Sequence, residues 1–106
     1  MSRYMRIMIM FDLPSKEDYE KKEYTVFRKN LIKNGYIMMQ FSVYIKCVTM
    51  QNKTEQEINK IKNFIPQNGN IRVIEISENQ YKNMRIILGN KNENEKYNSV
   101  DRYVKI

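Results

Sequence analysis

The residue with the clearest potential for chemistry is Asp12, which stands at the end of an apolar run. Residues 6–14 read Arg-Ile-Met-Ile-Met-Phe-Asp-Leu-Pro, and seven of these nine are apolar or proline. Such a run before a proline predicts a buried strand that ends near Leu13. A carboxylate at the end of a core strand costs free energy unless a partner stabilises it. A functional role is therefore one interpretation of Asp12, although capping the next helix or beginning a turn is the more common role.

The composition excludes most other enzyme chemistry. The chain contains no histidine and one cysteine. One protomer therefore cannot form a histidine acid–base site, a serine or cysteine triad, or a zinc site of histidines and cysteines. Cys47 lies in an apolar, strand-like segment, which predicts a small buried residue rather than a reactive thiol. Carboxylate and metal chemistry remains, and a protein without catalytic activity is the alternative.

The charge of the chain favours an anionic partner. Nineteen lysines and arginines stand against twelve acids, which gives a net charge of +7. Nucleic acid is a better candidate than a membrane, because no basic amphipathic helix has a face made of Trp or Phe residues. No apolar run approaches the length that spans a bilayer, and the first residues lack the pattern of a secretion signal. We therefore expect a cytoplasmic protein that does not bind membranes.

A helix is predicted after the first strand, up to about Asn34. Tyr24, Phe27 and Leu31 fall on one of its faces, and Gly35 is a favourable residue to end it. These basic residues occupy its remaining surface: Lys21, Lys22, Arg28, Lys29 and Lys33. They could contact phosphates, although a solvated charged face is the more common role of such a surface.

Residues 36–48 are rich in aromatic and β-branched residues and are too long for one average strand. They predict a hairpin with strands at about 36–40 and 42–48. Thr54 and Glu57 have the spacing of a capping box, which predicts that a second amphipathic helix begins there. Pro and Gly residues then end this helix.

The last third of the chain predicts further strands and a polar tail. Residues 71–76 predict a fourth strand, and residues 77–83 a polar connection. The apolar segment 84–89 predicts one extra strand. Residues 90–106 form a polar C-terminal tail, expected to be mobile, in which 100–106 could add a short strand.

This order of elements predicts an α+β fold in residues 1–89, the ferredoxin-like βαββαβ sandwich with an extra C-terminal strand. Both helices of this fold cover one face of the sheet, so the apolar opposite face needs another cover. A homodimer that packs sheet to sheet, with segment 84–89 crossing to the partner, would supply it.

The sequence resembles the Cas2 family of small CRISPR-associated proteins, in the form that accompanies systems with a single large effector nuclease. The resemblance spans about residues 4–89. The segments that carry it are Phe11–Pro14, Phe27–Leu31, Asn34–Tyr36, Gln40–Ile45 and Gln80–Gly89.

The resemblance implies a homodimer that joins a CRISPR-associated integrase to capture and insert new spacers. It also implies a metal-dependent endonuclease activity. The metal-binding aspartate of the family maps onto Asp12. Phe11 stands where relatives carry an aromatic residue and Arg28 where relatives carry a helix arginine, while Ser42 in the hairpin turn is a weaker match.

These observations and the resemblance suggest two functions, one as an enzyme and one as a scaffold protein. In the first, the two Asp12 carboxylates of a dimer share a Mg²⁺ ion that serves phosphodiester hydrolysis, while Arg28 or nearby lysines hold the substrate phosphates. In the second, the dimer is a scaffold that bridges integrase dimers, and Lys21, Lys22, Lys29 and Lys33 grip duplex DNA. A toxin-like endoribonuclease of the same fold, acting alone, is a third candidate. The sequence does not distinguish RNA from DNA as the substrate.

Overall fold

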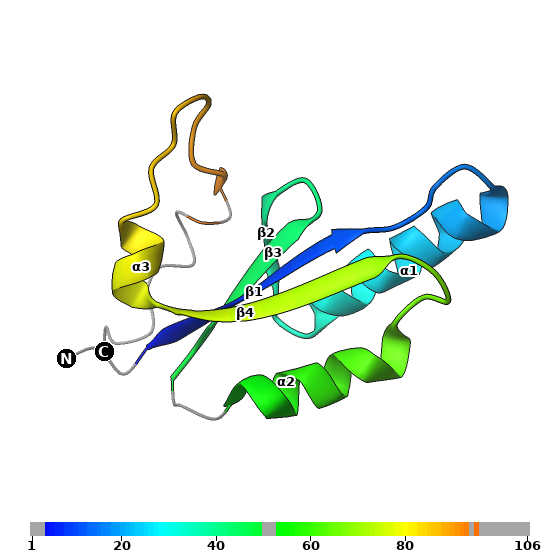
Figure 1. Ribbon diagram of the computed structural model, residues 1–106, viewed down its shortest axis with the longest axis horizontal. Helices are drawn as coiled ribbons and strands as arrows, with labels where there is room; N and C mark the ends of the chain where they lie inside the picture. The colour runs from blue at the N-terminus through cyan, green and yellow to red at the C-terminus, as the bar shows by residue number, and fades with distance from the viewer. Residues whose placement is uncertain (1–3, 50–52, 94, 96–106) are drawn as a thin grey trace.

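A four-stranded antiparallel sheet is the centre of the molecule, which is described here from a computed structural model (Figure 1). The structure describes residues 4–49, 53–93 and 95. Its elements are β1 (Met5–Asp12), α1 (Asp18–Lys33), β2 (Ile37–Gln40), β3 (Val43–Val48), α2 (Lys53–Ile61), the 3₁₀ turn η1 (Lys62–Phe64), β4 (Asn70–Ser77) and α3 (Glu78–Lys82). In this described part of the chain, no helix is both long enough and apolar enough to cross a membrane.

The strands lie in the order β2-β3-β1-β4, so β1 is central and pairs with β3 and β4. Met5 pairs with Val48 and Met10 with Val43 on one side, while Met5 pairs with Ser77 and Asp12 with Asn70 on the other. The predicted α+β fold with two helices alternating among four strands is confirmed, including the hairpin of β2 and β3.

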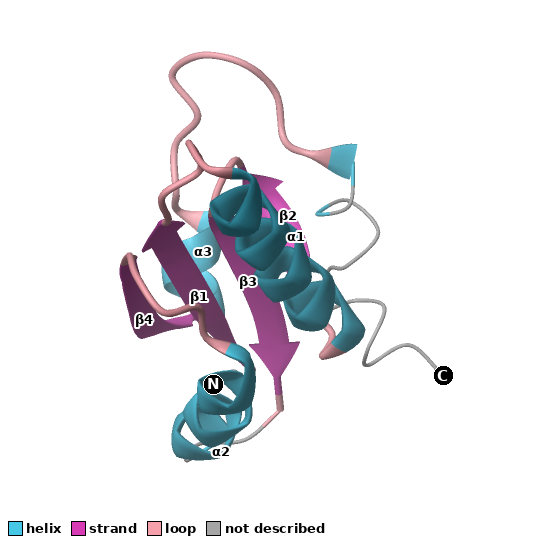
Figure 2. Cartoon of the chain, turned by 90° about the vertical axis from the view of Figure 1, so that its right-hand side faces the viewer, coloured by secondary structure: helices cyan, strands magenta, loops and turns pink. Residues whose placement is uncertain are grey.

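Side chains along β1 point alternately to the two faces of the sheet. Ile7, Ile9 and Phe11 join the main core with Phe27 and Leu31 of α1. Figure 2 shows α1 and α2 on this side of the sheet and α3 behind it. We call this side the helix face and the other side the open face. A smaller cluster on the open face contains Met8, Ile45 and Tyr81 of α3, with partly buried residues around it: Met10, Ile37, Met39, Val43 and Ile76.

The sequence of α1 explains its bounds. Its first turn is held by Glu20, whose carboxylate accepts a hydrogen bond from the backbone N–H of Glu17 at 2.9 Å. At its end, Gly35 has a φ of +94°, which a glycine adopts at little cost. The backbone N–H of Tyr36 then donates to the carbonyl of Leu31 at 3.0 Å. The helix predicted up to about Asn34 is confirmed.

The capping box predicted for Thr54 and Glu57 is wrong. Thr54 lies inside α2, and its hydroxyl donates to the carboxylate of Glu75 on β4 at 2.7 Å. Glu57 is buried and accepts hydrogen bonds from Tyr36 and Lys46. Both side chains therefore join the helix to the sheet instead of capping the helix.

Two predictions for the segment after β4 are also wrong. The predicted polar connection contains α3, which begins with a true capping box: the Ser77 hydroxyl accepts from the backbone N–H of Gln80, and the Gln80 side chain accepts from that of Ser77. Residues 84–89 form no strand in the described chain. They border a cavity of about 410 Å³ with Met39 and Tyr81, and Ile87 is 96% exposed.

The open face is thus partly covered by α3, an element that the sequence interpretation did not foresee. Tyr81 supplies this cover over Met8 and Ile45. Of the tail 90–106, residues 94 and 96–106 lie outside the described residues, and so does the terminal strand suggested for 100–106.

Candidate active site at the end of the first strand

Asp12 is the last residue of β1 and is exposed. Phe11 points into the helix-face core, so alternation puts Asp12 on the open face, the face of Met8 and Met10. Its cross-strand partner is Asn70, the first residue of β4. The carboxylate thus stands at the edge of an apolar surface, where an approaching molecule can reach it.

Gly69 fixes the position of this strand end. Its φ is +124°, and a Cβ at this residue would lie 2.5 Å from Leu13 Cδ2 and 2.9 Å from the carbonyl oxygen of Asp12. Only a glycine lets the turn before β4 approach the backbone of Asp12 so closely. The loop and the catalytic candidate are therefore packed against each other through the backbone.

The hairpin turn supports the strand end from the other side. The backbone N–H of Phe11 donates to the carbonyl of Ser42 at 3.1 Å. Ser42 has a φ of 62°, and its hydroxyl is 3.1 Å from the hydroxyl of Tyr24 on α1. The side chain of Ser42 therefore anchors the turn to the helix and does not lie beside the Asp12 carboxylate.

Phe11 is likewise part of the structural core. Its ring is buried in the core, 5.1 Å from the ring of Phe27 and 5.7 Å from that of Tyr44 between centroids. Phe11 and Asp12 are neighbours in sequence but point to opposite faces of the sheet. The aromatic ring therefore fixes the strand rather than contacting a substrate at Asp12.

Sequence reasoning missed Arg72, which shares the open face with Asp12. Arg72 pairs with Met10 on β1, and its side chain is exposed. It is therefore the diagonal cross-strand neighbour of Asp12. A guanidinium at this point can bind a phosphate that approaches the carboxylate. The sequence pattern of β4 includes Arg72. Only the pairing register with β1 shows which face of the sheet Arg72 occupies and that Asp12 is its neighbour.

The basic residues of α1 lie away from Asp12, on the helix-face side of the sheet. Arg28 donates through Nε to the hydroxyl of Tyr44 at 2.9 Å. The other four are exposed at the surface of the helix: Lys21, Lys22, Lys29 and Lys33. The structure therefore separates the predicted phosphate-binding residues from the predicted catalytic carboxylate within one chain.

A divalent metal ion fits this donor set only in part. Mg²⁺ prefers oxygen ligands and often takes one or two carboxylates together with water and substrate phosphates. Asp12 supplies one exposed carboxylate, and within the described residues no group of three or more acidic, cysteine or histidine side chains could hold a metal. The described residues alone therefore do not complete a metal site at Asp12.

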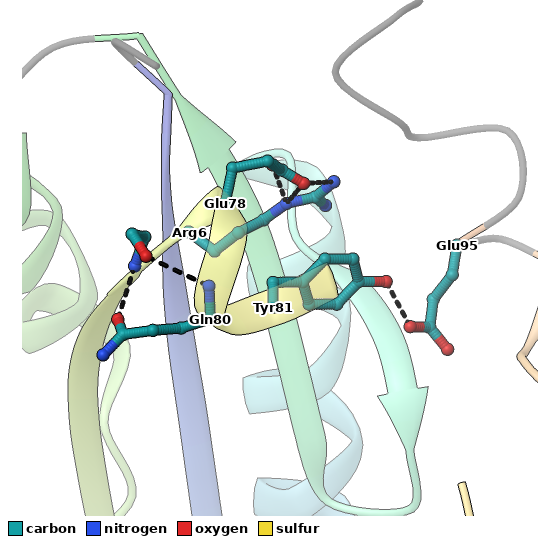
Figure 3. A network of polar contacts seen from close by, with 6 residues as sticks. Arg6, Glu78, Gln80, Tyr81 and Glu95 are labelled. Carbon is teal, nitrogen blue, oxygen red and sulfur yellow. Dashed lines mark hydrogen bonds and ion pairs between the residues drawn. The ribbon is translucent and has the colours of Figure 1, made fainter. Parts of the chain in front are cut away.

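At the opposite end of the open face, a buried ion pair joins β1 to α3 (Figure 3). The Arg6 guanidinium donates to Glu78 through Nε and Nη2 at 3.0–3.3 Å and lies over the Tyr81 ring, 4.2 Å from its centroid. Burial alone would lower the pKa of Arg6, but the hydrogen bonds and charge of Glu78 raise it. The hydroxyl of Tyr81 in turn donates to Glu95.

A second buried carboxylate, Glu57, joins α2 to the helix face. The Tyr36 hydroxyl and Lys46 Nζ each donate to it at 3.0 Å, and Lys60 lies 3.4 Å away. Burial alone would raise the pKa of Glu57, but the hydrogen bonds from Lys46 and Tyr36 and the charges of both lysines lower it. Burial next to this carboxylate raises the pKa of Tyr36. Each group has partners inside the fold, so this cluster stabilises the structure and leaves Asp12 as the exposed candidate.

Comparison with known families gives one consistent result. Residues 5–84 match the model of the family described as CRISPR associated protein Cas2. The chain is 40% identical over 97 residues to the CRISPR-associated endoribonuclease Cas2 of Campylobacter jejuni, covering 92% of this chain and 68% of that protein. It is 42% identical over 87 residues to the protein of the same name from Ligilactobacillus salivarius, covering 82% of this chain and 86% of that protein.

Among solved structures, the chain is similar to one described as a crystal structure of Cas2. The TM-score is 0.54 at 15% sequence identity, and the match covers 85% of this chain and 92% of the other. At this identity the likeness shows a shared fold.

Proposed function

This chain belongs to the CRISPR-associated protein Cas2 family, and from that premise we propose that it is a homodimeric component of CRISPR adaptation with a Mg²⁺-dependent endonuclease site at Asp12. The relatives named above are called endoribonucleases, which makes RNA the first substrate to test.

One observation carries the proposal: the exposed Asp12 lies on the same face as the partly covered apolar residues of the sheet. Ile74 is 47% exposed on this face, and the apolar segment after α3 includes Ile87 and Leu88, which are 96% and 92% exposed. Burying this surface against a second copy is favourable, and a two-fold axis pairs equal surfaces. We propose that the two-fold axis passes near this end of the face, because only a residue close to the axis lies beside its own copy, and the two Asp12 carboxylates would then lie together.

The chain's own residues would do the following in such a dimer. The two Asp12 carboxylates would hold one Mg²⁺ ion, which when bound supplies positive charge beside the phosphate and a water of lowered pKa. Arg72 would bind and orient the scissile phosphate beside Asp12. Gly69 and Ser42 would hold the strand end so that the carboxylate keeps its position.

The scaffold role is part of the same proposal. The exposed lysines of α1 form a basic surface on the side of the sheet away from the open face, so a dimer would carry one such surface on each outer side. These lysines would grip the backbone of duplex DNA through charge, with little dependence on base sequence. The integrase would bind the dimer while the DNA is held.

A paired assay of the wild type and Asp12→Asn tests the function. Each protein is given single-stranded RNA and duplex DNA with Mg²⁺ or with EDTA, and each is tested for spacer integration with the cognate integrase. Asp12→Asn keeps the size of the side chain and removes its charge, so we expect cleavage to fall at least a hundredfold with little change in stability. Integration should persist if the scaffold acts independently of cleavage.

The assay needs one control variant, and two outcomes would argue against the proposal. Asp18→Asn removes an exposed carboxylate at the start of α1 and should leave cleavage unchanged. Metal-dependent cleavage that survives in Asp12→Asn would refute the proposed site. Growth arrest by the protein in cells without other CRISPR genes would instead support a toxin-like endoribonuclease that acts alone.

A further inference from the structure

Phe41 is a large apolar side chain displayed at the turn between β2 and β3. Its side chain is 79% exposed, and one face of its ring stacks on Tyr24, with centroids 6.0 Å apart and ring planes at 21°. An exposed aromatic ring with a supporting ring behind it offers its other face to a flat partner. Neither the packing of the core nor the position of Asp12 depends on an aromatic side chain at residue 41.

The turn holds this ring in a fixed position. Ser42 bonds to Tyr24 through its hydroxyl and to β1 through its carbonyl. Tyr24 is itself packed edge-on against the buried ring of Phe11, with centroids 5.9 Å apart. The two stacked rings of Phe41 and Tyr24, which we call the platform, therefore rest on the core. A partner that stacks on the platform loses little conformational entropy in ordering it.

Two cations flank Tyr24 on α1, while Glu20 and Glu23 border a small pocket on another side of the Tyr24 ring. Lys21 and Arg28 lie one turn before and one turn after Tyr24 on the same stripe of α1. Arg28 uses Nε to bind Tyr44, and its two terminal nitrogens have no partner within the described residues, so they are available to an anion. An aromatic ring between two cations suits a flat base joined to phosphates, and it suits an acidic or purely apolar partner less well.

The platform also lies at the same end of the sheet as Asp12. The register that pairs Met10 with Val43 continues beyond β3 with the bond from Phe11 to Ser42. Phe41 is the next residue back along the chain, and its ring lies against Tyr24 of α1, on the helix-face side of this strand end. Figure 1 shows the turn between β2 and β3 beside the tip of β1. A strand of nucleic acid that stacks one base on Phe41 would have to pass around this end of the sheet, from the helix face to the open face, to bring its backbone to Asp12.

We propose that Phe41, backed by Tyr24 and flanked by Lys21 and Arg28, is a stacking site for an unpaired nucleobase of a single-stranded polynucleotide. The inference rests on the proposed function, because it assigns a substrate class to the same end of the sheet: unpaired strand, in preference to duplex. Base stacking tolerates every base, so the site selects for unpaired strand and not for sequence.

Binding in EDTA tests this site without any cleavage. Fluorescence anisotropy measures the affinity for a labelled single-stranded RNA, the same sequence as single-stranded DNA, and the duplex. Phe41→Leu keeps an apolar side chain but removes the flat ring, and we expect it to weaken single-strand binding roughly tenfold and duplex binding hardly at all. Phe41→Tyr should bind like the wild type, and Ile65→Ala, which trims another exposed apolar side chain, should change neither affinity.

A crosslink identifies the contact directly. Single strands that carry 5-iodouracil are irradiated with each protein, and the adduct is located by mass spectrometry. We expect the adduct on the aromatic ring of Phe41 in the wild type, at the same position in Phe41→Tyr, and its loss in Phe41→Leu; the RNA and DNA strands show which sugar the site accepts. Equal single-strand affinity for the wild type and Phe41→Leu, or an equal loss for duplex, overturns the proposal. Because no metal is present, this result is independent of whether Asp12 supports cleavage.

Discussion

Glu57 is a buried carboxylate that keeps its charge because Lys46 and Tyr36 donate to it inside the fold. Its pKa is lowered below its ordinary value of 4.5. A carboxyl group with a lowered folded pKa stabilises the protein fully above its unfolded pKa, and the stabilisation is lost as the pH falls through the folded pKa. The contribution of Glu57 should therefore be complete at neutral pH and decline under acid.

We predict that Glu57→Gln destabilises the protein by about 2 kcal/mol at pH 7, since a charged hydrogen-bonded group is lost while Lys46 remains. The difference from the wild type should shrink below pH 4. Urea unfolding of both proteins between pH 7 and pH 3 measures it. Glu55→Gln, on the exposed side of the same helix, should differ little from the wild type at every pH. A constant difference for Glu57→Gln across this range would contradict the assignment.

At the scale of the elements, the close approach of the turn before β4 to β1 depends on Gly69. We predict that Gly69→Ala destabilises the protein by about 2–3 kcal/mol, because the added Cβ meets Leu13 and the carbonyl of Asp12 and because the φ is positive. Thermal unfolding and the Mg²⁺-dependent cleavage assay should both register the change, since the displaced backbone is that of Asp12.

Gly89→Ala is the matched control for Gly69→Ala. Its φ is also positive, at +92°, but an added Cβ would have no heavy atom within 4 Å. It should cost about 1 kcal/mol or less, from backbone strain alone, and leave cleavage unchanged. Similar losses in the two variants would mean that strain, and not the contact with β1, explains the effect.

The elements that the sequence predicts correctly are those whose patterns are local. The run that ends at Asp12, the stripe of Tyr24, Phe27 and Leu31, and the Asn34-Gly35 pair each specify their element without information from the rest of the chain. The short helix α3 was missed although Ser77 and Gln80 have capping-box spacing, because the polar composition of the segment obscured it. Thr54 and Glu57 have the same kind of spacing and no such role, since burial gave both side chains partners on the sheet.

The candidate site was predictable to the extent that it depends on one strand. Asp12 follows from its position at a strand end. Its neighbour Arg72 follows only from the register between β1 and β4, and the inward direction of Phe11 follows only once the helices are known to cover that face. These are consequences of long-range pairing, which a pattern along one segment does not contain.

At the scale of the whole molecule, the open face and the segment after α3 predict self-association. The wild type should elute as a dimer of the 12.9 kDa chain in size-exclusion chromatography with light scattering. Ile87→Asp should raise the dimer dissociation constant roughly a thousandfold. Burying an isoleucine is worth about 2 kcal/mol, and a two-fold interface contains the change twice.

Ile65→Asp is the control for Ile87→Asp. Ile65 is 52% exposed after η1, away from the open face, so its replacement should leave the dimer intact. A wild type that measures as a monomer at micromolar concentration would remove the basis for two Asp12 carboxylates in one site.

The position of Cys47 gives a way to follow the opening of this fold over time. Cys47 pairs with Arg6 across β1 and β3, its thiol is buried, and burial raises its pKa. Because it is the one sulfhydryl in the sequence, a thiol reagent can label each chain at a single place, and only after this end of the open face has been uncovered, by movement of α3 or by separation of the strands. The labelling rate therefore measures how often the end of the sheet that contains Arg6 opens. If a bound partner slows the labelling, the ratio of the two rates measures how much that partner stabilises the closed state.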